Sequence, residues 1–399
     1  MNKPAGTYIA DQDSLRRLCQ QLVGTKRLAL DTEFVGENTF VPRLELLQIA
    51  TEECCAAIDV PAVESLDALI PSLTDVSVEK VVHAGRQDLE LLHGHLGRLP
   101  APIFDTQLAA AMVGYGTQVG YAPLVQRVLG KTLHKEHTLT NWSQRPLTTE
   151  QVEYALEDVR FLLPLHTHLA HRLTTLGRLD WVREEFSNLA ARPADESNDP
   201  RRRYERIKGW DSLRPRAAAV LRELAAWREK EARRRNVPRG RVVREDILLE
   251  LARRAPNSAD ALRSMRGCSP SLVDRYGERL IELIAMGSAV PASQLPDVRR
   301  TPKPDPDTAG RTDLLQAVLK ACAHKASIAP TLLATTSDLH ALVEAKGGVE
   351  KLEVPILTGW RRQIAGETLL RVLAGKTQVS LDPHTGALEL SDRDHGASR

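Results

Sequence analysis

The chain has 399 residues, which exceeds the size at which a single hydrophobic core keeps growing, so we expect two or three domains. The net charge of +2 conceals an asymmetry, because residues 1–200 carry 18 Lys and Arg against 27 Asp and Glu, whereas residues 201–399 carry 36 against 25. An acidic first half therefore precedes a basic second half. This favours carboxylate chemistry in the first half and contact with a polyanion in the second.

The cysteine pattern argues against a disulfide-stabilised or zinc-binding protein. The sequence has five cysteines with no CxxC spacing, and an odd number cannot form a complete set of disulfides. The first residues show no apolar core of signal-peptide type, and no run of about 18 apolar residues occurs in the sequence. We therefore expect a soluble protein of the cytoplasm that does not contact a membrane.

The first half has the pattern of a mixed α/β sheet. Short apolar runs separated by turn-forming residues predict a meander of antiparallel strands, and later strands alternate with helices. The expected strands are residues 27–33, 44–50, 54–60 and 79–85, with one more beginning at residue 102. The expected helices are residues 63–72, 86–93, 106–113 and 149–176, and Pro164 is expected to kink or split the last of these.

The second half is predicted to be helical, with linkers at residues 191–203 and 291–310. The expected helices are residues 216–235, 242–253, 258–265, 270–286, 314–325 and 339–346. Val237-Pro238 follows the first long helix much as Ile328-Ala329-Pro330 follows the second, which suggests two diverged copies of one helical unit. Residues 380–399 lack apolar density and are expected to be loose.

Asp31 and Glu33 end the first apolar strand, and residues two apart on a strand point to the same face. Two adjacent carboxylates repel each other unless a cation lies between them, and a divalent metal with oxygen ligands is the usual solution. The alternative is a pair of solvated acids on an edge strand.

Two later segments supply further acids. Asp88 falls in the first turn of a predicted helix, where interaction with the helix dipole is an alternative role. Tyr154 and Asp158 lie four residues apart, so that a helix presents them on one face. The alternative is a half-buried tyrosine beside a surface acid.

In this order, the motifs resemble the tyrosine branch of the DEDD exonuclease superfamily, and the flanking residues resemble the ribonuclease D family along essentially the whole chain. The segments that carry this resemblance are Asp31-Thr32-Glu33-Phe34, His83-Ala84-Gly85, Arg145-Pro146-Leu147 and Tyr154-Ala155-Leu156-Glu157-Asp158. The resemblance implies a ribonuclease H-like α/β exonuclease domain at residues 1–195, followed by two all-α HRDC-type domains at residues 204–290 and 311–375 and a tail at 376–399. In the second of these domains, Val318 stands where the first has Trp227, and fewer basic residues surround it.

The resemblance also implies a chemistry. The four acids would hold two divalent metal ions, Mg²⁺ or Mn²⁺. Asp31 would be shared between the two ions. Glu33 and Asp158 would complete the site that holds the attacking water, and Asp88 would hold the second ion. Tyr154 would orient that water, since its ordinary pKa near 10 makes it a poor base. The implied substrate is RNA, especially tRNA precursors, shortened from the 3′ end with release of nucleoside 5′-monophosphates. No obligate protein partner is implied.

Three further residues, Gln48, Lys135 and Arg145, are candidates for contact with the substrate. Arg233-Arg234-Arg235 is either a phosphate contact or a solvated helix end.

Several other functions fit the sequence less well or stay open. A helicase is disfavoured because Gly130-Lys131-Thr132 and Gly375-Lys376-Thr377 lack the earlier glycine of a phosphate-binding loop. The histidines at 134 and 137, or at 166, 168 and 171, lack nearby cysteines and are better explained as surface side chains than as zinc ligands. A non-enzymatic RNA-binding scaffold conflicts with the presence of all four acids and the tyrosine. A DNA-directed 3′-to-5′ exonuclease remains open, because recognition of the 2′-hydroxyl depends on pocket contacts.

Overall fold

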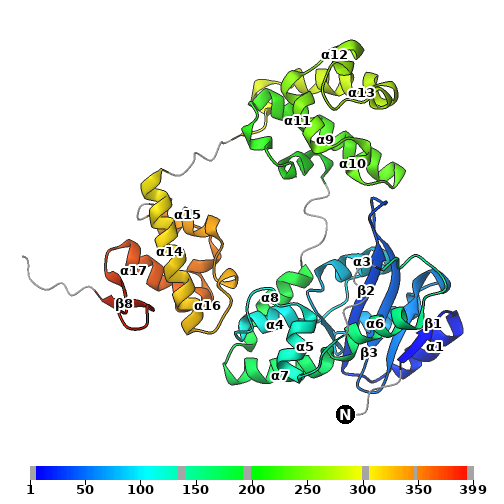
Figure 1. Ribbon diagram of the computed structural model, residues 1–399, viewed down its shortest axis with the longest axis vertical. Helices are drawn as coiled ribbons and strands as arrows, with labels where there is room; N and C mark the ends of the chain where they lie inside the picture. Colours follow the sequence, from blue (N-terminus) through cyan, green and yellow to red (C-terminus); the bar gives the residue numbers. More distant parts are fainter. Residues whose placement is uncertain (1–5, 134–139, 192–198, 299–304, 346–347, 393–399) are drawn as a thin grey trace, which may run out of the picture.

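The computed structural model describes residues 6–133, 140–191, 199–298, 305–345 and 348–392, and it has an α/β domain followed by two helical domains (Figure 1). The predicted fold class is confirmed. The α/β domain is built on a six-stranded sheet with the strand order β1-β4-β3-β2-β5-β6. Its strands are β1 (Gly6–Ile9), β2 (Arg27–Val35), β3 (Arg43–Ala50), β4 (Cys55–Asp59), β5 (Glu79–Val82) and β6 (Ile103–Asp105).

The centre of the sheet is the predicted antiparallel meander of β2, β3 and β4. Strands β1, β5 and β6 add to it in parallel, β1 beside β4 and β5 beside β2. Because side chains alternate along each strand, β2 sends Leu28 and Leu30 into one core and Ala29 into another. The sheet is therefore buried on both faces.

Helices cover these two faces. Helices α1 (Gln12–Gln21) and α3 (Arg86–Leu96) pack on the face of Leu28 and Leu30. Helix α6 (Thr149–Arg160) crosses the opposite face over β2, β3 and β4. The remaining helices of the domain are α2 (Ile70–Thr74), α4 (Thr106–Met112), α5 (Tyr121–Leu129), α7 (Leu162–Thr175) and α8 (Leu179–Ala191).

Two predictions for this domain need comment. The long helical segment at 149–176 is split, as expected, with a break at Phe161 and with Pro164 in the first turn of α7. The helix predicted at 63–72 is only partly correct, since the helical segment begins with a 3-10 turn at Asp67–Leu69 and continues into α2 at Ile70. The side chain of Gln12 accepts the backbone N–H groups of Glu64 and Ser65, at 3.0 and 3.2 Å, and so ties these two residues to α1 in a non-helical path.

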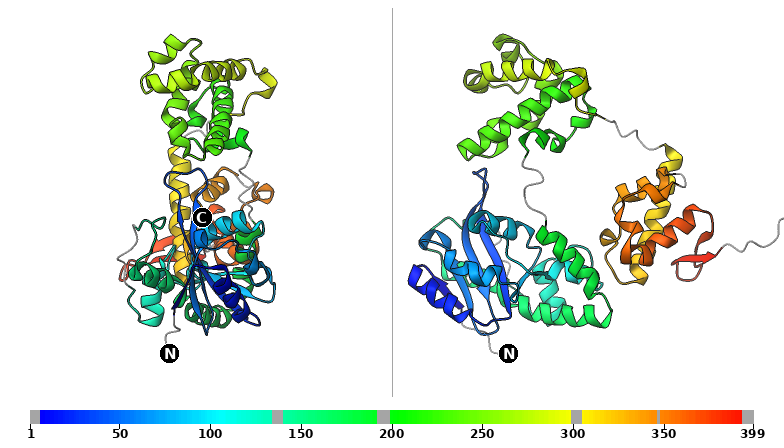
Figure 2. Two further views of the ribbon diagram at one scale, coloured as in Figure 1. Left: turned by 90° about the vertical axis from the view of Figure 1, so that its right-hand side faces the viewer. Right: turned by 180° about the vertical axis from the view of Figure 1, so that it is seen from behind.

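The first helical domain is built around α9 (Pro215–Arg235) and α13 (Pro270–Ser288). Its other helices are α10 (Arg239–Val242), α11 (Glu245–Arg254) and α12 (Ala259–Arg263). Gly287 permits the two long helices to approach closely, because a Cβ there would lie 2.5 Å from the Cα of Val220. The hairpin between β2 and β3 reaches this domain beside α10 (Figures 1 and 2), where the Asn236 Oδ1 accepts the N–H of Phe40 at 3.1 Å.

The second helical domain contains α14 (Pro306–Lys325), α15 (Thr336–Glu344), α16 (Gly359–Arg361), a π-helical turn (Arg362–Gly366) and α17 (Glu367–Leu373). Helix α14 begins inside the segment expected to be a linker, because Asp305 caps it by accepting the N–H of Thr308 at 3.0 Å and Pro306 occupies its first turn.

The expectation of a loose tail from residue 380 is wrong for the part that the structure describes. Strands β7 (Thr377–Leu381) and β8 (Leu388–Asp392) form an antiparallel hairpin. The carboxylate of Asp382 organises the turn by accepting the N–H groups of His384 and Thr385, at 2.7 and 2.9 Å. Residues 393–399 lie outside the described residues.

The second helical domain packs directly on the α/β domain, and the two share one hydrophobic core. The guanidinium of Arg178 donates to the carbonyl oxygens of Met112 at 2.6 Å and Ser327 at 3.2 Å, which joins the two domains. The N–H of Ala329 donates to the carbonyl of Ala111 at 2.9 Å. These backbone contacts fix the position of this helical domain on α4 and α8.

Candidate active site

Three carboxylates converge where β2 passes under α6. Asp31 and Glu33 lie on the same face of β2, and α6 brings Asp158 over them. One carboxylate oxygen from each of the three residues lies within 4.8 Å of the others. This cluster comes from two segments more than a hundred residues apart in the chain.

The fourth predicted acid, Asp88, approaches from α3. The residue between the two acids of β2, Thr32, is buried on the opposite face, and its hydroxyl donates a hydrogen bond to Asp88 Oδ1. Asp88 is close enough to Asp31 to raise the pKa of that carboxyl. Alternation along β2 thus presents Asp31 and Glu33 on one face while Thr32 holds Asp88 from the other.

The turn before α3 is shaped by residues that sequence reasoning did not assign. Asp105 accepts the N–H groups of Ala84 and Gly85, at 3.2 and 3.0 Å, and also caps α4. Gly85 is required because a Cβ there would lie 2.6 Å from Val82. Together these contacts set the start of α3, and therefore the position of Asp88.

The electrostatics of the cluster are dominated by burial and by repulsion between carboxylates. Burial, followed by the charges of Asp88 and Asp158, raises the pKa of Asp31 well above its ordinary value. Burial and the charge of Asp158 raise the pKa of Glu33 to about 8, and burial raises the pKa of Asp158 to about 7. Burial also raises the pKa of Asp88, against the opposing effect of the Thr32 hydrogen bond. A nearby cation would relieve this repulsion.

Tyr154 lies on α6 one turn before Asp158 and is half-buried. Burial, then the charge of Asp158, raises its pKa, so the hydroxyl stays protonated at neutral pH. Its ring lies beside Trp142, with centroids 6.1 Å apart. Arg145 holds that tryptophan's segment in place by donating to the carbonyl of Trp142 at 2.6 Å.

Tyr121 is a partly buried residue of this site that the sequence did not reveal. Its hydroxyl donates to the carbonyl of Glu157 at 3.0 Å and accepts the N–H of Phe161 at 3.2 Å. In an uninterrupted helix these two backbone groups would bond to each other, so the hydroxyl is inserted into the helical hydrogen-bond ladder. The insertion separates α6 from α7 at Phe161, within one helical turn of Asp158.

The three predicted substrate contacts lie in different environments. Gln48 is fully buried in β3. The guanidinium of Arg145 forms two hydrogen bonds with the Asp59 carboxylate, at 2.6 and 2.8 Å. Lys135 lies outside the described residues. Contact of Arg145 and Lys135 with the substrate stays a prediction, whereas the full burial of Gln48 argues against its direct contact with RNA.

The donor set fits a divalent cation with oxygen ligands. The four side chains offer only oxygen, and each is a pure acceptor once ionised. Three of them already bring one oxygen each into a common volume. The groups that most perturb the pKa values of Asp31 and Glu33, apart from burial, are other carboxylates.

Comparison with known proteins places this geometry in a family. The 3′-5′ exonuclease family matches residues 7–174, and the HRDC domain family matches residues 217–284. The chain is 38% identical to the ribonuclease D of Acidiphilium cryptum over 380 residues, which is 94% of this chain and 95% of that one. The chain belongs to the ribonuclease D family.

Two further relatives agree with this assignment. Ribonuclease D of Pseudomonas paraeruginosa is 39% identical over 372 residues, covering 93% of this chain and 98% of that protein. The crystal structure of Escherichia coli RNase D, described as an exoribonuclease involved in structured RNA processing, superposes with a TM-score of 0.82 at 31% identity and covers 95% of this chain and 100% of that chain. As a member of the ribonuclease D family, the protein is a 3′-to-5′ exoribonuclease with a helical HRDC region after its catalytic domain. Among the described residues, none of the helices is long and apolar enough to span a membrane.

Proposed function

We propose that this ribonuclease D family enzyme removes nucleotides singly from the 3′ ends of RNA, tRNA precursors in particular, and releases nucleoside 5′-monophosphates in the cytoplasm. The observation that carries the proposal is the convergence of Asp31, Glu33 and Asp158 oxygens within 4.8 Å of one another. Such a cluster does not stabilise the fold, because burial and mutual repulsion oppose ionisation of its carboxyl groups. A catalytic role explains why it is kept.

The side chains have distinct roles in this proposal. Asp31 lies between the others and would contribute to both of two divalent sites, Glu33 and Asp158 would complete one, and Asp88 would complete the second. A pair of Mg²⁺ or Mn²⁺ ions would supply charge neutralisation at the scissile phosphate and lower the pKa of water. Tyr154, protonated and one turn from Asp158, would orient the attacking water through its hydroxyl.

The charge distribution supports a division of work between the domains. Residues 201–250 carry 16 Lys and Arg against 8 Asp and Glu. Some of these cations are held by protein groups: Arg234 pairs with Glu231 at 2.8 Å, and Arg235 donates to the Tyr276 hydroxyl at 2.6 Å. The excess of positive charge remains, and it would attract RNA phosphates that the acidic catalytic cluster repels.

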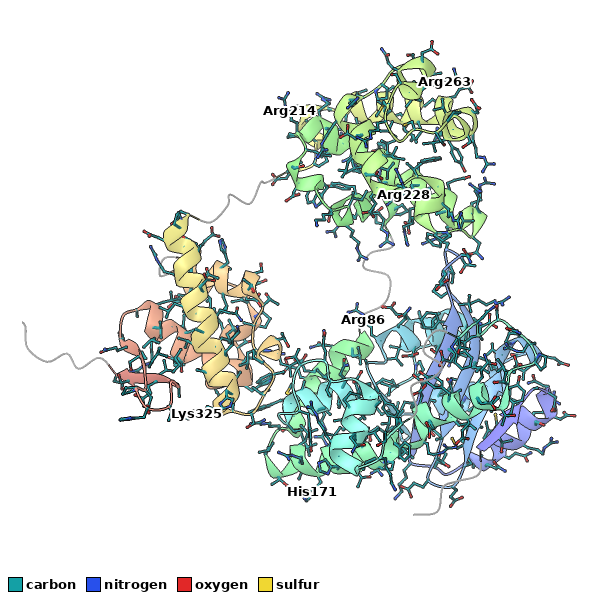
Figure 3. The ribbon with its side chains drawn as sticks, viewed as in Figure 1. Arg86, His171, Arg214, Arg228, Arg263 and Lys325 are labelled. Carbon is teal, nitrogen blue, oxygen red and sulfur yellow. The ribbon has the colours of Figure 1, made fainter. Side chains whose placement is uncertain are left out.

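Arg86 is a cation close to the catalytic cluster. It is the first residue of α3, two positions before Asp88, and its ion pair with Glu90 at 3.4 Å is exposed and therefore weak. Figure 3 labels it on the side of the α/β domain that faces the first helical domain. It would be available to an RNA backbone entering between the two.

The experiment that tests this function compares substrates under one set of conditions. Precursor tRNA with a 3′ extension, single-stranded RNA and single-stranded DNA of the same sequence are labelled at the 5′ end and incubated with Mg²⁺ or Mn²⁺. We expect a ladder of RNA products shortened one nucleotide at a time and nucleoside 5′-monophosphates in solution. Faster shortening of DNA than of RNA would favour the DNA-directed exonuclease instead.

A further inference from the structure

Gln48 lies beside Asp31 at the centre of the sheet. Strands β2 and β3 are antiparallel, and their register places Gln48 directly opposite Asp31, while Ala57 of β4 lies on its other side. Residues directly opposite in an antiparallel pair share a face, with Cβ atoms about 4.5 to 5.5 Å apart. Gln48 therefore points to the face of the sheet that carries Asp31.

The burial of this amide is complete. The exposed fraction of Gln48 is 0%, and α6 covers this face with the buried residues Ala155 and Leu156. The side chains two positions along the strand, Leu46 and Ala50, are apolar. RNA therefore has no direct access to Gln48.

Neither polar atom of the amide is satisfied by the protein. Among the described residues, no hydrogen-bond partner is found for Gln48 Nε2 or for Gln48 Oε1. A buried amide without partners destabilises the fold, because it has lost its hydrogen bonds to water and gained none within the protein. The polar side chain next to it in the strand register is the carboxylate of Asp31. An apolar side chain of the same size would fit this position at less cost.

We propose that Gln48 is a positioning residue whose amide N–H donates to the Asp31 carboxylate when that carboxylate holds a divalent cation. This inference rests on the proposed two-ion function. An ionised carboxylate accepts hydrogen bonds on both oxygens, so one oxygen can hold cations while the other accepts from Gln48. Carboxylates that ligate metals are commonly oriented by such partners, and loss of the partner lowers metal affinity about 10- to 100-fold.

If Gln48 has this role, one substitution should affect thermal stability and metal binding differently. Replacing Gln48 by methionine removes the donor and keeps the volume close to that of the native side chain. In the metal-free protein the substitution removes an unpaired buried amide, so we expect the thermal midpoint to be unchanged or raised. With metal present, Asp31 loses its orienting partner.

The test measures Mn²⁺ binding by titration calorimetry on the full chain without RNA, together with thermal midpoints in EDTA. Gln48→Met and Gln48→Leu are expected to bind Mn²⁺ at least tenfold more weakly than the wild type, and to have midpoints in EDTA no lower than the wild type. Ile49→Met is the matched control, because Ile49 is the next residue of β3, fully buried on the opposite face. It is expected to bind Mn²⁺ like the wild type.

Two results would overturn this inference. Wild-type Mn²⁺ affinity in both Gln48 variants would show that Asp31 needs no such partner. A midpoint in EDTA lowered by both Gln48 variants, and not by Ile49→Met, would show that the amide serves the fold. Either result would leave the proposed function standing, whereas failure of the wild type itself to bind Mn²⁺ would contradict that function.

Discussion

Trp181 of α8 and Trp360 of α16 stack on each other, with ring centroids 5.0 Å apart and planes 10° apart. The guanidinium of Arg178 lies 5.5 Å from the Trp181 ring, and that of Arg361 lies 4.3 Å from the Trp360 ring. The stack thus has a guanidinium close to each ring and crosses the contact between the α/β domain and the second helical domain. Arg361 also forms an ion pair with Glu185 of α8. The second helical domain is therefore a structural support of the catalytic domain.

This contact predicts that Trp360→Ala destabilises both domains together. Removing a buried tryptophan costs about 3 to 5 kcal/mol, because its transfer free energy is lost and a cavity remains. We expect a lower thermal midpoint and faster proteolysis, measured by calorimetry and limited digestion. Arg362→Ala is the control, since Arg362 is exposed and pairs only with the exposed Glu367 among the described ion pairs. Equal midpoints for Trp360→Ala and the wild type would contradict this interpretation.

The carboxylate cluster predicts the effect of neutralising single acids. Asp31→Asn, Asp88→Asn and Asp158→Asn are each expected to abolish hydrolysis, because each removes one charge from the set that would hold the divalent ions. The thermal midpoint in EDTA should be equal or higher for Asp31→Asn, since that carboxyl suffers repulsion from its neighbours. Hydrolysis at the wild-type rate in any of these variants would remove that residue from the site.

The raised pKa values predict how the stability of the metal-free protein depends on pH. Glu33 and Asp158 have pKa values raised to about 8 and about 7, so in the folded state they keep protons that the unfolded chain has released. The contribution of these two groups to the free energy of unfolding is therefore largest at low pH, and it falls as pH rises from about 4 to about 8. A divalent cation should reverse this loss.

The measurement is a set of thermal midpoints at pH 5 and pH 8, each with EDTA and with Mn²⁺. We expect Mn²⁺ to raise the midpoint more at pH 8 than at pH 5, and Asp31→Asn to reduce that difference. If Mn²⁺ raised the thermal midpoint more at pH 5 than at pH 8, the result would contradict this prediction.

The position of α10 predicts a phosphate contact by the first helical domain. Arg241 is exposed on α10, the helix beside the hairpin of the α/β domain (Figures 1 and 2). Arg241→Gln should weaken binding of tRNA-sized RNA and reduce the slope of log affinity against log salt by about 1. Arg263→Gln is the matched control, because Figure 3 places Arg263 at the end of the same domain away from the α/β domain. If both variants lost the same affinity for RNA, the positive charge would attract RNA nonspecifically and α10 would not provide a particular phosphate contact.

Much of the fold followed from local patterns. The meander of β2 to β4 was predictable because apolar runs and turn residues alternate there, and the break near Pro164 followed from the geometry of proline. Strand β1 and helix α1 were not predicted. Strand β1 has only four residues, three of them exposed, and depends on pairing with β4. The hairpin of β7 and β8 was missed because it has little apolar content.

Strand and helix periodicities indicated which of the predicted acids share a face, and the resemblance to the ribonuclease D family joined them, with Asp88, into one predicted site. The residues that position them were not found, because their roles depend on contacts between distant segments. Tyr121 acts on a helix break 36 residues later, and Asp105 holds a turn 20 residues earlier. Thr32 lies between the two acids in the sequence, but its role in holding Asp88 follows only from the hydrogen bond that its hydroxyl donates to that carboxylate.

The proposed function depends on four carboxylates from β2, α3 and α6 that gather around a pair of divalent cations. The most informative measurement is anomalous diffraction from crystals soaked in Mn²⁺. We expect two adjacent anomalous peaks, both contacted by Asp31, one also contacted by Glu33 and Asp158, and the other near Asp88. Peaks confined to other parts of the molecule, with none at these carboxylates, would show that the carboxylates do not hold these ions.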